Sequence, residues 1–141
     1  MEVRIATPDD ARDLFALNTL FGNSTTLECL RKSLAENDRE LVCIAFVDGK
    51  AAGYCTGLIV KSMCYADSRA DLEALYVKEE HRGRGVGEAL LLCQEEALAA
   101  RGVHHFHIVT QKDNHGARAL YTKLGYTPAG EILLDKTRTG A

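Results

Sequence analysis

A glycine-rich loop with two arginines, Arg82-Gly83-Arg84-Gly85-Val86-Gly87, separates a strand-like run ending at Val77 from a helix-like run beginning at Glu88. Glycines lack the side chains that would keep backbone N–H groups from converging on an anion, and the N-terminus of the next helix carries partial positive charge. Arg82 and Arg84 add charged donors that suit a pyrophosphate. The loop therefore predicts a phosphate-binding site, and a solvated glycine-rich turn is the alternative.

Two other kinds of phosphate loop are excluded by the neighbouring residues. A P-loop needs Gly-Lys-Ser or Gly-Lys-Thr at its end, but Gly87 is followed by Glu88 and Ala89. A dinucleotide fingerprint needs the spacing Gly-x-Gly-x-x-Gly and an acidic residue at the end of a second strand, and neither is present. Walker-type and hydride-transfer chemistry are therefore not expected.

The loop resembles the acyl-CoA-binding motif of the GNAT superfamily of N-acetyltransferases. That motif is Arg or Gln, two residues, Gly, one residue, then Gly or Ala, and Arg82, Gly85 and Gly87 match it. Leu75-Tyr76-Val77 is similar to the family's fourth strand, and the stretch 114–126 is similar to its last helix-to-strand segment. The resemblance extends over roughly residues 70 to 128 and implies an acetyl-CoA-dependent enzyme.

The resemblance also implies where acetyl-CoA binds. In the family the pantetheine arm pairs with the fourth strand, and a backbone N–H there polarises the thioester carbonyl. Asn114 would cap its helix and also touch the CoA arm. The residues expected to bind acetyl-CoA are Leu75, Tyr76, Val77, Arg82, Gly83, Arg84, Gly85, Val86, Gly87, Glu88 and Asn114.

Two residues are expected to move protons during the reaction. The resemblance places the family's tyrosine at Tyr121, where a phenol can protonate the departing thiolate. Glu73 matches a glutamate that polyamine-acetylating members use to bind the acceptor or to remove its proton. A packing tyrosine and an exposed strand carboxylate are the respective alternatives, and Asp71, Asp67 and Glu28 are weaker candidates for the base.

Composition sets the bounds of the domain. A chain of 141 residues that is 46% hydrophobic can bury the core of one domain, so residues 1–141 are expected to form a single N-acetyltransferase domain. Five scattered cysteines without a Cys-x-x-Cys pair disfavour a disulfide framework and a zinc site, and indicate a reducing compartment. The N-terminus has no apolar signal region and no stretch approaches the ~20 apolar residues of a membrane span, so a cytoplasmic protein is expected. A formal net charge of -3 gives no support for nucleic-acid binding.

The histidines His104, His105 and His107 are not expected to bind a metal. On a strand the first two point to opposite faces, and no carboxylate or cysteine stands at a recognised ligand spacing. No metal site is predicted.

Hydrophobic periodicity predicts an α/β domain with a mixed central sheet of about six to seven strands flanked by about four helices. Asp48-Gly49 is a hairpin signal between two strands. The expected strands are 3–6, 41–47, 51–60, 72–77, 106–110 and 132–134, and the expected helices begin at Thr7, Thr26, Gly85 and Asn114. This order matches the GNAT layout.

The sequence thus predicts an acetyl-CoA-dependent N-acetyltransferase in which a bound primary amine attacks the thioester directly in a ternary complex. Acidic residues on the expected acceptor side, among them Glu28 and Glu73, favour a small cationic amine such as a polyamine or an aminoglycoside. The alternatives are acetylation of protein or peptide amino groups, and a CoA-binding sensor without turnover. The resemblance also allows a homodimer.

Overall fold

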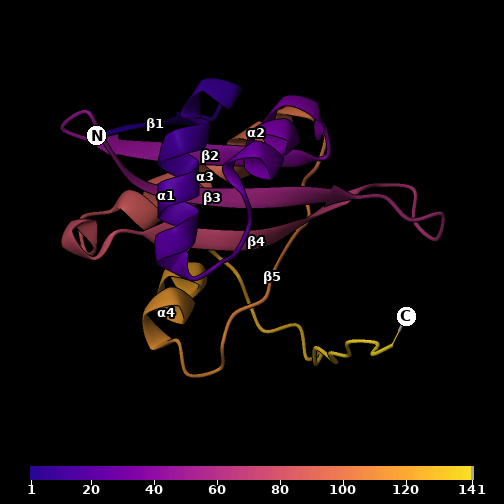
Figure 1. Cartoon of the computed structure of the whole chain (residues 1–141). Helices are drawn as coiled ribbons and strands as arrows, with labels where there is room; N and C mark the ends of the chain where they lie inside the picture. The colour runs from indigo at the N-terminus through magenta and orange to yellow at the C-terminus, as the bar shows by residue number, and fades with distance from the viewer. Residues whose placement is uncertain (141) are drawn as a thin grey trace. The chain divides into compact units, whose positions relative to one another are not determined.

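The computed structural model describes residues 1–140, which form two compact units, residues 1–109 and residues from 110 onward. The first unit contains β1 (Glu2–Ile5), the 3-10 turn η1 (Pro8–Asp10), α1 (Ala11–Phe21), α2 (Leu27–Glu36), β2 (Glu40–Val47), β3 (Lys50–Val60), β4 (Arg69–Val77), the 3-10 turn η2 (Glu79–His81), α3 (Val86–Ala100) and β5 (Phe106–Ile108). The second unit contains α4 (His115–Lys123) (Figure 1).

The strands of the first unit form one sheet in the order β1-β2-β3-β4-β5. The first four strands pair antiparallel, and β4 pairs parallel with β5. The turn between β2 and β3 has positive φ at both central residues, 52° at Asp48 and 76° at Gly49, as a two-residue hairpin requires. This confirms the hairpin that the sequence predicts.

The pairing of β3 with β4 contains a register shift. Thr56 lies opposite Ala74, but its neighbour Gly57 lies opposite Leu72. One residue of β4, Glu73, therefore has no counterpart on β3, which is the arrangement of a β-bulge.

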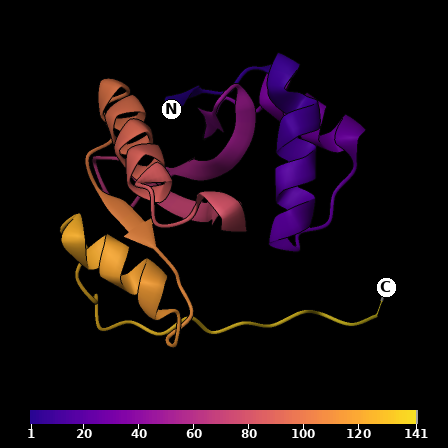
Figure 2. The same ribbon diagram turned by 90° about the vertical axis from the view of Figure 1, so that its left-hand side faces the viewer.

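Helices cover both faces of this sheet, with α1 and α2 on one face and α3 on the other (Figures 1 and 2). On the first face Leu14 and Leu17 pack with Ile44 and Tyr54. On the opposite face α3 contributes Val86 and Leu90. They pack with Cys43 of β2 and Cys55 of β3, two free cysteines that lie opposite each other in the sheet. The alternation of side chains along each strand thus divides the core into two layers.

A glycine on β3 allows α3 to approach the sheet closely. A Cβ atom at Gly57 would lie 2.6 Å from Nε2 of the fully buried Gln94. That Nε2 donates a hydrogen bond of 3.0 Å to the carbonyl oxygen of Leu41, so the amide is held between helix and sheet. Any larger residue at position 57 would displace it.

An ion pair joins β1 to the first helical turn. The Arg4 guanidinium donates two hydrogen bonds, of 2.8 and 2.9 Å, to the carboxylate of the buried Asp10. The backbone N–H of Thr7 donates a third, of 2.8 Å. These bonds, the Arg4 contact foremost, hold the pKa of Asp10 below its usual value.

Replacement of Asp10 by Asn is expected to destabilise the protein by roughly 1–3 kcal/mol at neutral pH, because the charged acceptor of three hydrogen bonds is lost. Since the folded pKa is depressed, the stabilisation is present above the unfolded pKa and is lost as pH falls through the folded pKa. Urea unfolding at a series of pH values measures this. Asp13→Asn, at an exposed position in the first turn of α1, is the control and should cost less than about 1 kcal/mol. An equal loss in both variants would contradict the assignment.

The second unit is built around α4. Its N-cap is Asn114, whose side chain accepts a hydrogen bond of 3.2 Å from the N–H of Ala117. The helix ends at Lys123; just beyond it Gly125 has a φ of 96°, and the N–H of Tyr126 donates to the carbonyl oxygen of Tyr121. Residues 127–140 form neither helix nor strand.

The predicted fold class is confirmed, but the strand count is lower than predicted. The described residues contain five strands, whereas six to seven were expected. Ile132, Leu133 and Leu134, expected as a last strand, lie in an extended segment without ladder partners and are 74–82% exposed. An apolar run predicts a strand only if a neighbouring strand satisfies its backbone, and none does so in the described chain. Whether the chain is one domain stays a prediction.

Candidate active site

The glycine-rich loop adopts the conformation that its glycines permit. Gly83 and Gly85 have φ angles of 76° and 82°, in the left-handed region that residues with a Cβ rarely adopt. Gly85 is the N-cap of α3 and has no side chain with which to cap this helix end. The N-cap residue therefore offers the first-turn N–H groups of α3 no side-chain acceptor, which suits a bound anion.

Arg82 connects the loop to the end of β4. Its Nε donates a hydrogen bond of 2.9 Å to the carbonyl oxygen of Val77, and its guanidinium carbon lies 5.7 Å from the centre of the Tyr76 ring. Arg82 therefore positions the loop, a role that the sequence did not reveal. Arg84 is exposed and remains the simpler candidate for a phosphate donor.

One edge of β4 is open next to this loop. β5 pairs with β4 only over Ala70, Asp71 and Leu72. Beyond Leu72, no other strand among residues 1–140 pairs with β4 on the side away from β3. The predicted acetyl-CoA residues Leu75, Tyr76 and Val77 lie in this part of β4, so an extended ligand could pair with their backbone.

The side chains of these three residues belong to the core. Leu75 and Val77 pack on the α3 side of the sheet, and Tyr76 packs on the α1 side. The Tyr76 ring stacks on Phe21 of α1, with ring centres 5.3 Å apart. Packing and predicted ligand binding therefore use different atoms of the same residues.

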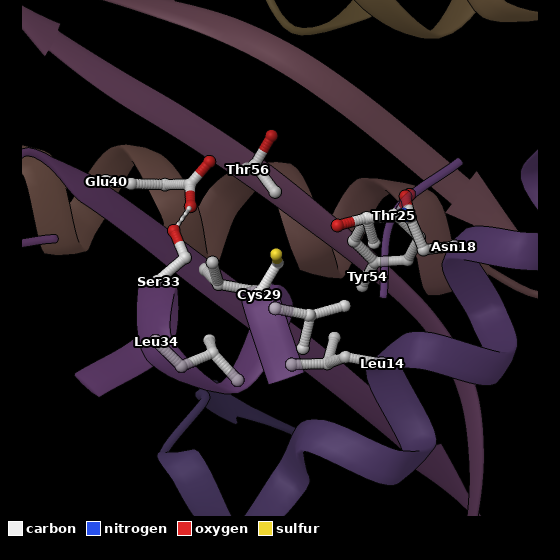
Figure 3. A pocket seen from close by; sticks show the side chains of 11 residues that line it. Leu14, Asn18, Thr25, Cys29, Ser33, Leu34, Glu40, Tyr54 and Thr56 are labelled. Carbon is white, nitrogen blue, oxygen red and sulfur yellow. Dashed lines mark hydrogen bonds between the residues drawn. The ribbon is translucent and has the colours of Figure 1, made fainter. Parts of the chain in front are cut away.

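A cavity of about 380 Å³ opens between α1, α2, β2 and β3 (Figure 3). This volume is at the lower end of the ~300–1,000 Å³ typical of small-molecule sites. Its lining combines leucines and a valine with hydroxyl, amide, thiol and carboxylate groups. The lining residues are Leu14, Asn18, Thr25, Cys29, Leu30, Ser33, Leu34, Glu40, Val42, Tyr54 and Thr56.

Glu40 supplies the carboxylate of this cavity. It accepts a hydrogen bond of 3.4 Å from the Ser33 hydroxyl, drawn in Figure 3. Burial raises the pKa of Glu40, the Ser33 bond lowers it, and the nearby charge of Glu73 raises it further. The predicted base Glu73, the exposed bulge residue of β4, thus lies close enough to Glu40 for the two charges to interact.

Tyr54 closes one side of the cavity. Its hydroxyl donates a hydrogen bond of 2.6 Å to Oδ1 of Asn18. Burial raises the pKa of Tyr54 to about 12, so the phenol stays protonated at neutral pH. Its ring also contacts Phe21 edge-on at 6.4 Å. Tyr54 therefore shapes the cavity wall.

The other candidate residues are placed as follows. Asn114 and Tyr121 lie in the second unit, where Tyr121 is half-buried and its ring centre is 6.1 Å from that of Tyr126. Asp71, another candidate base, accepts a hydrogen bond of 3.1 Å at Oδ1 from Nε of Arg69. Oδ1 of Asp71 also lies 3.8 Å from Nδ1 of His107.

Two of the three clustered histidines contact each other, since the Nε2 atoms of His105 and His107 are 3.0 Å apart. Over residues 1–140 the structure places no three His, Cys, Asp or Glu side chains where they could together hold a metal ion. The same residues include no helix long and apolar enough to span a membrane.

Comparison with known proteins identifies the class. The sequence model of the acetyltransferase (GNAT) family matches residues 10–126. An acetyltransferase of Yersinia pestis (strain Pestoides F) and one of Pectobacterium atrosepticum are each 30% identical, over 96% of this chain and 94% of theirs. This chain therefore belongs to the acetyltransferase (GNAT) family, and the prediction of an acetyltransferase is confirmed.

Solved structures show the same fold. An aminoglycoside acetyltransferase from an uncultured soil metagenomic sample, in complex with trehalose, has a TM-score of 0.85 at 16% identity, covering 99% of this chain and 96% of the other. The aminoglycoside N-acetyltransferase AAC(6')-Iy in complex with CoA has a TM-score of 0.84 at 17% identity, covering 98% and 95%. A ribosomal-protein-alanine N-acetyltransferase of Brucella melitensis has a TM-score of 0.81 at 15% identity, covering 97% and 100%. At these identities the likeness concerns the fold alone.

Proposed function

We propose that this acetyltransferase uses acetyl-CoA to acetylate a primary amine of a small cationic acceptor, by direct attack in a ternary complex. One observation carries the proposal: the open edge of β4 is followed, after the short turn η2, by a loop with two glycines of positive φ and by a helix whose N-cap is a glycine. An extended chain ending in a pyrophosphate fits such a surface, because the strand offers backbone pairing and the helix offers N–H donors.

The donor would be held mainly by backbone groups. The N–H groups around Gly85 and Gly87 would bind the phosphates, and Arg84 would add a charge. Backbone groups of Leu75, Tyr76 and Val77 would bind the pantetheine arm. Acetyl-CoA supplies the activated acyl group, and the strand holds its carbonyl against a backbone N–H.

The acceptor would enter the cavity beneath α1 and α2. Glu40 and Glu73 make the region beside β3 acidic, which favours a cationic amine. Only a neutral amine attacks, so a carboxylate near the reacting nitrogen has to accept its proton, and Glu73 is the proposed base. Tyr121 is the proposed acid for the thiolate, as the family resemblance implies.

The proposal is tested by following release of the CoA thiol with a panel of polyamines, aminoglycosides, simple alkylamines and peptide N-termini. Release with small amines supports it. Release with peptides alone would favour acetylation of protein amino groups, and the similarity to the Brucella melitensis structure motivates that arm of the panel. CoA binding without release for any acceptor would indicate a sensor.

Replacement of Glu73 by Gln is expected to lower kcat/KM for a cationic amine by about 10²-fold, while the affinity for CoA stays unchanged. The acidic limb of the pH–rate profile should flatten, because no carboxylate then titrates at the acceptor. Asp71→Asn changes the other candidate base on the same strand and should keep the shape of the profile. A Glu73→Gln enzyme with the parental profile and rate would assign proton removal to another group.

The homodimer and the cytoplasmic location stay predictions.

A further inference from the structure

Glu40 differs from the other residues around the cavity in carrying a charge. The remaining lining residues are apolar or neutral. Among the ion pairs of the described residues, none involves Glu40. The hydrogen bond that the Ser33 hydroxyl donates to Glu40 is long, at 3.4 Å, and its donor is uncharged. A half-buried carboxylate with so little compensation is a favourable place for a ligand cation.

The sheet register separates Glu40 from the proposed reaction centre. Glu40 of β2 lies opposite Leu58 of β3, and Leu58 lies opposite Asp71, two residues before Glu73 on β4. At ~4.8 Å per strand, β2 and β4 are roughly 10 Å apart. A cationic group bound at Glu40 and an amine that gives its proton to Glu73 would thus be joined, in one ligand, by a chain of several bonds.

The cavity beside Glu40 has one part that suits a hydrocarbon chain. Leu14, Leu30, Leu34 and Val42 form its apolar walls. Oδ1 of Asn18, which could otherwise bind a ligand donor, already accepts from the Tyr54 hydroxyl and from Nδ2 of Asn23. A chain of methylenes loses less on entering such walls than a ring covered with hydroxyl groups, which would leave donors unpaired.

We propose that Glu40 binds the distal ammonium group of a linear diamine or polyamine while the proximal amine is acetylated beside Glu73. Glu40 is then the residue that selects acceptors with a second positive charge. This inference rests on the proposed function, because it needs the reaction centre at β4.

The test compares linear diamines, from ethylenediamine to octanediamine, with monoamines of the same chain length. The parent enzyme should show a higher kcat/KM for the diamine at an optimum length, mainly through KM. In Glu40→Gln the preference for hexanediamine over hexylamine should fall roughly 10- to 100-fold. Glu96→Gln, the same change on an exposed position of α3, is the matched control and should keep the preference.

A second variant separates recognition from folding. Glu40→Asp keeps the charge but withdraws it by one methylene, so the optimum should move to a longer diamine. A structural role for Glu40 would not shift a length optimum. If the parent acetylates no amine, the proposed function itself fails. If it acetylates amines without preferring diamines, or if Glu40→Gln keeps the preference, only the role of Glu40 is overturned.

Discussion

The Tyr121→Phe enzyme is expected to bind acetyl-CoA normally, to fold normally and to lose on the order of 10²–10⁴ in kcat. The substitution removes one oxygen and leaves the ring, which packs edge-on against Tyr126. A tyrosine hydroxyl is a weak acid and can give its proton to a departing thiolate. Steady-state kinetics with a good amine, together with calorimetric titration of CoA, measure the effect.

The control for this prediction is Tyr126→Phe, which removes a hydroxyl from the partner ring. Its kcat should change far less. A loss below about tenfold in Tyr121→Phe would mean that solvent supplies the proton and that Tyr121 only orients the sulfur. A kcat within about twofold of the parent, with product release excluded as the slow step, would remove Tyr121 from the mechanism.

Gly85→Val is expected to weaken CoA binding at least about 100-fold in a protein that still folds. The structure leaves space for a side chain at position 85, since an added Cβ would meet nothing within 4 Å. A β-branched residue adopts the φ of 82° found at Gly85 only at a cost of order 1–3 kcal/mol. The loop is therefore expected to change conformation in the variant, so that its N–H groups no longer converge on the phosphate. Calorimetric titration with CoA measures the loss.

Two variants show whether this loss belongs to the loop. Gly102→Val places the same residue at a φ of 81° just beyond the other end of α3, where it should cost stability without changing CoA affinity. Arg84→Ala removes one exposed charge and should weaken binding by less than about tenfold. Unchanged affinity in a folded Gly85→Val protein would overturn the assignment of the phosphate loop.

The parts of the site that depend on local backbone rules were predictable from sequence. The Asp48-Gly49 turn and the Asn114 cap of α4 follow from residue type alone, and the structure contains both. The glycine loop belongs to this group, because its spacing next to a helix start encodes its conformation. Whether these residues bind acetyl-CoA stays a prediction.

Features that depend on pairing between distant segments were not predictable. Residues 72–77 read as one regular strand, and the bulge at Glu73 exists only in the register with β3. Glu40 follows the polar stretch Asn37-Asp38-Arg39 and lies just before the predicted strand 41–47, so the sequence gives it no special role. Its cavity forms because α2 lies over β2, which no local pattern around Glu40 contains.

The β-bulge lets β4 carry Glu73 without changing which face of the sheet its core residues occupy. Leu72 faces α3 and Ala74 faces α1, and these are the faces that two consecutive residues of a regular strand would have. A β4 shortened by Glu73 would therefore keep every apolar side chain on its present face and lose only the extra carboxylate and its unpaired peptide. With Glu73 in its proposed role as the base, the number of residues in β4, as well as their identity, would contribute to the reaction.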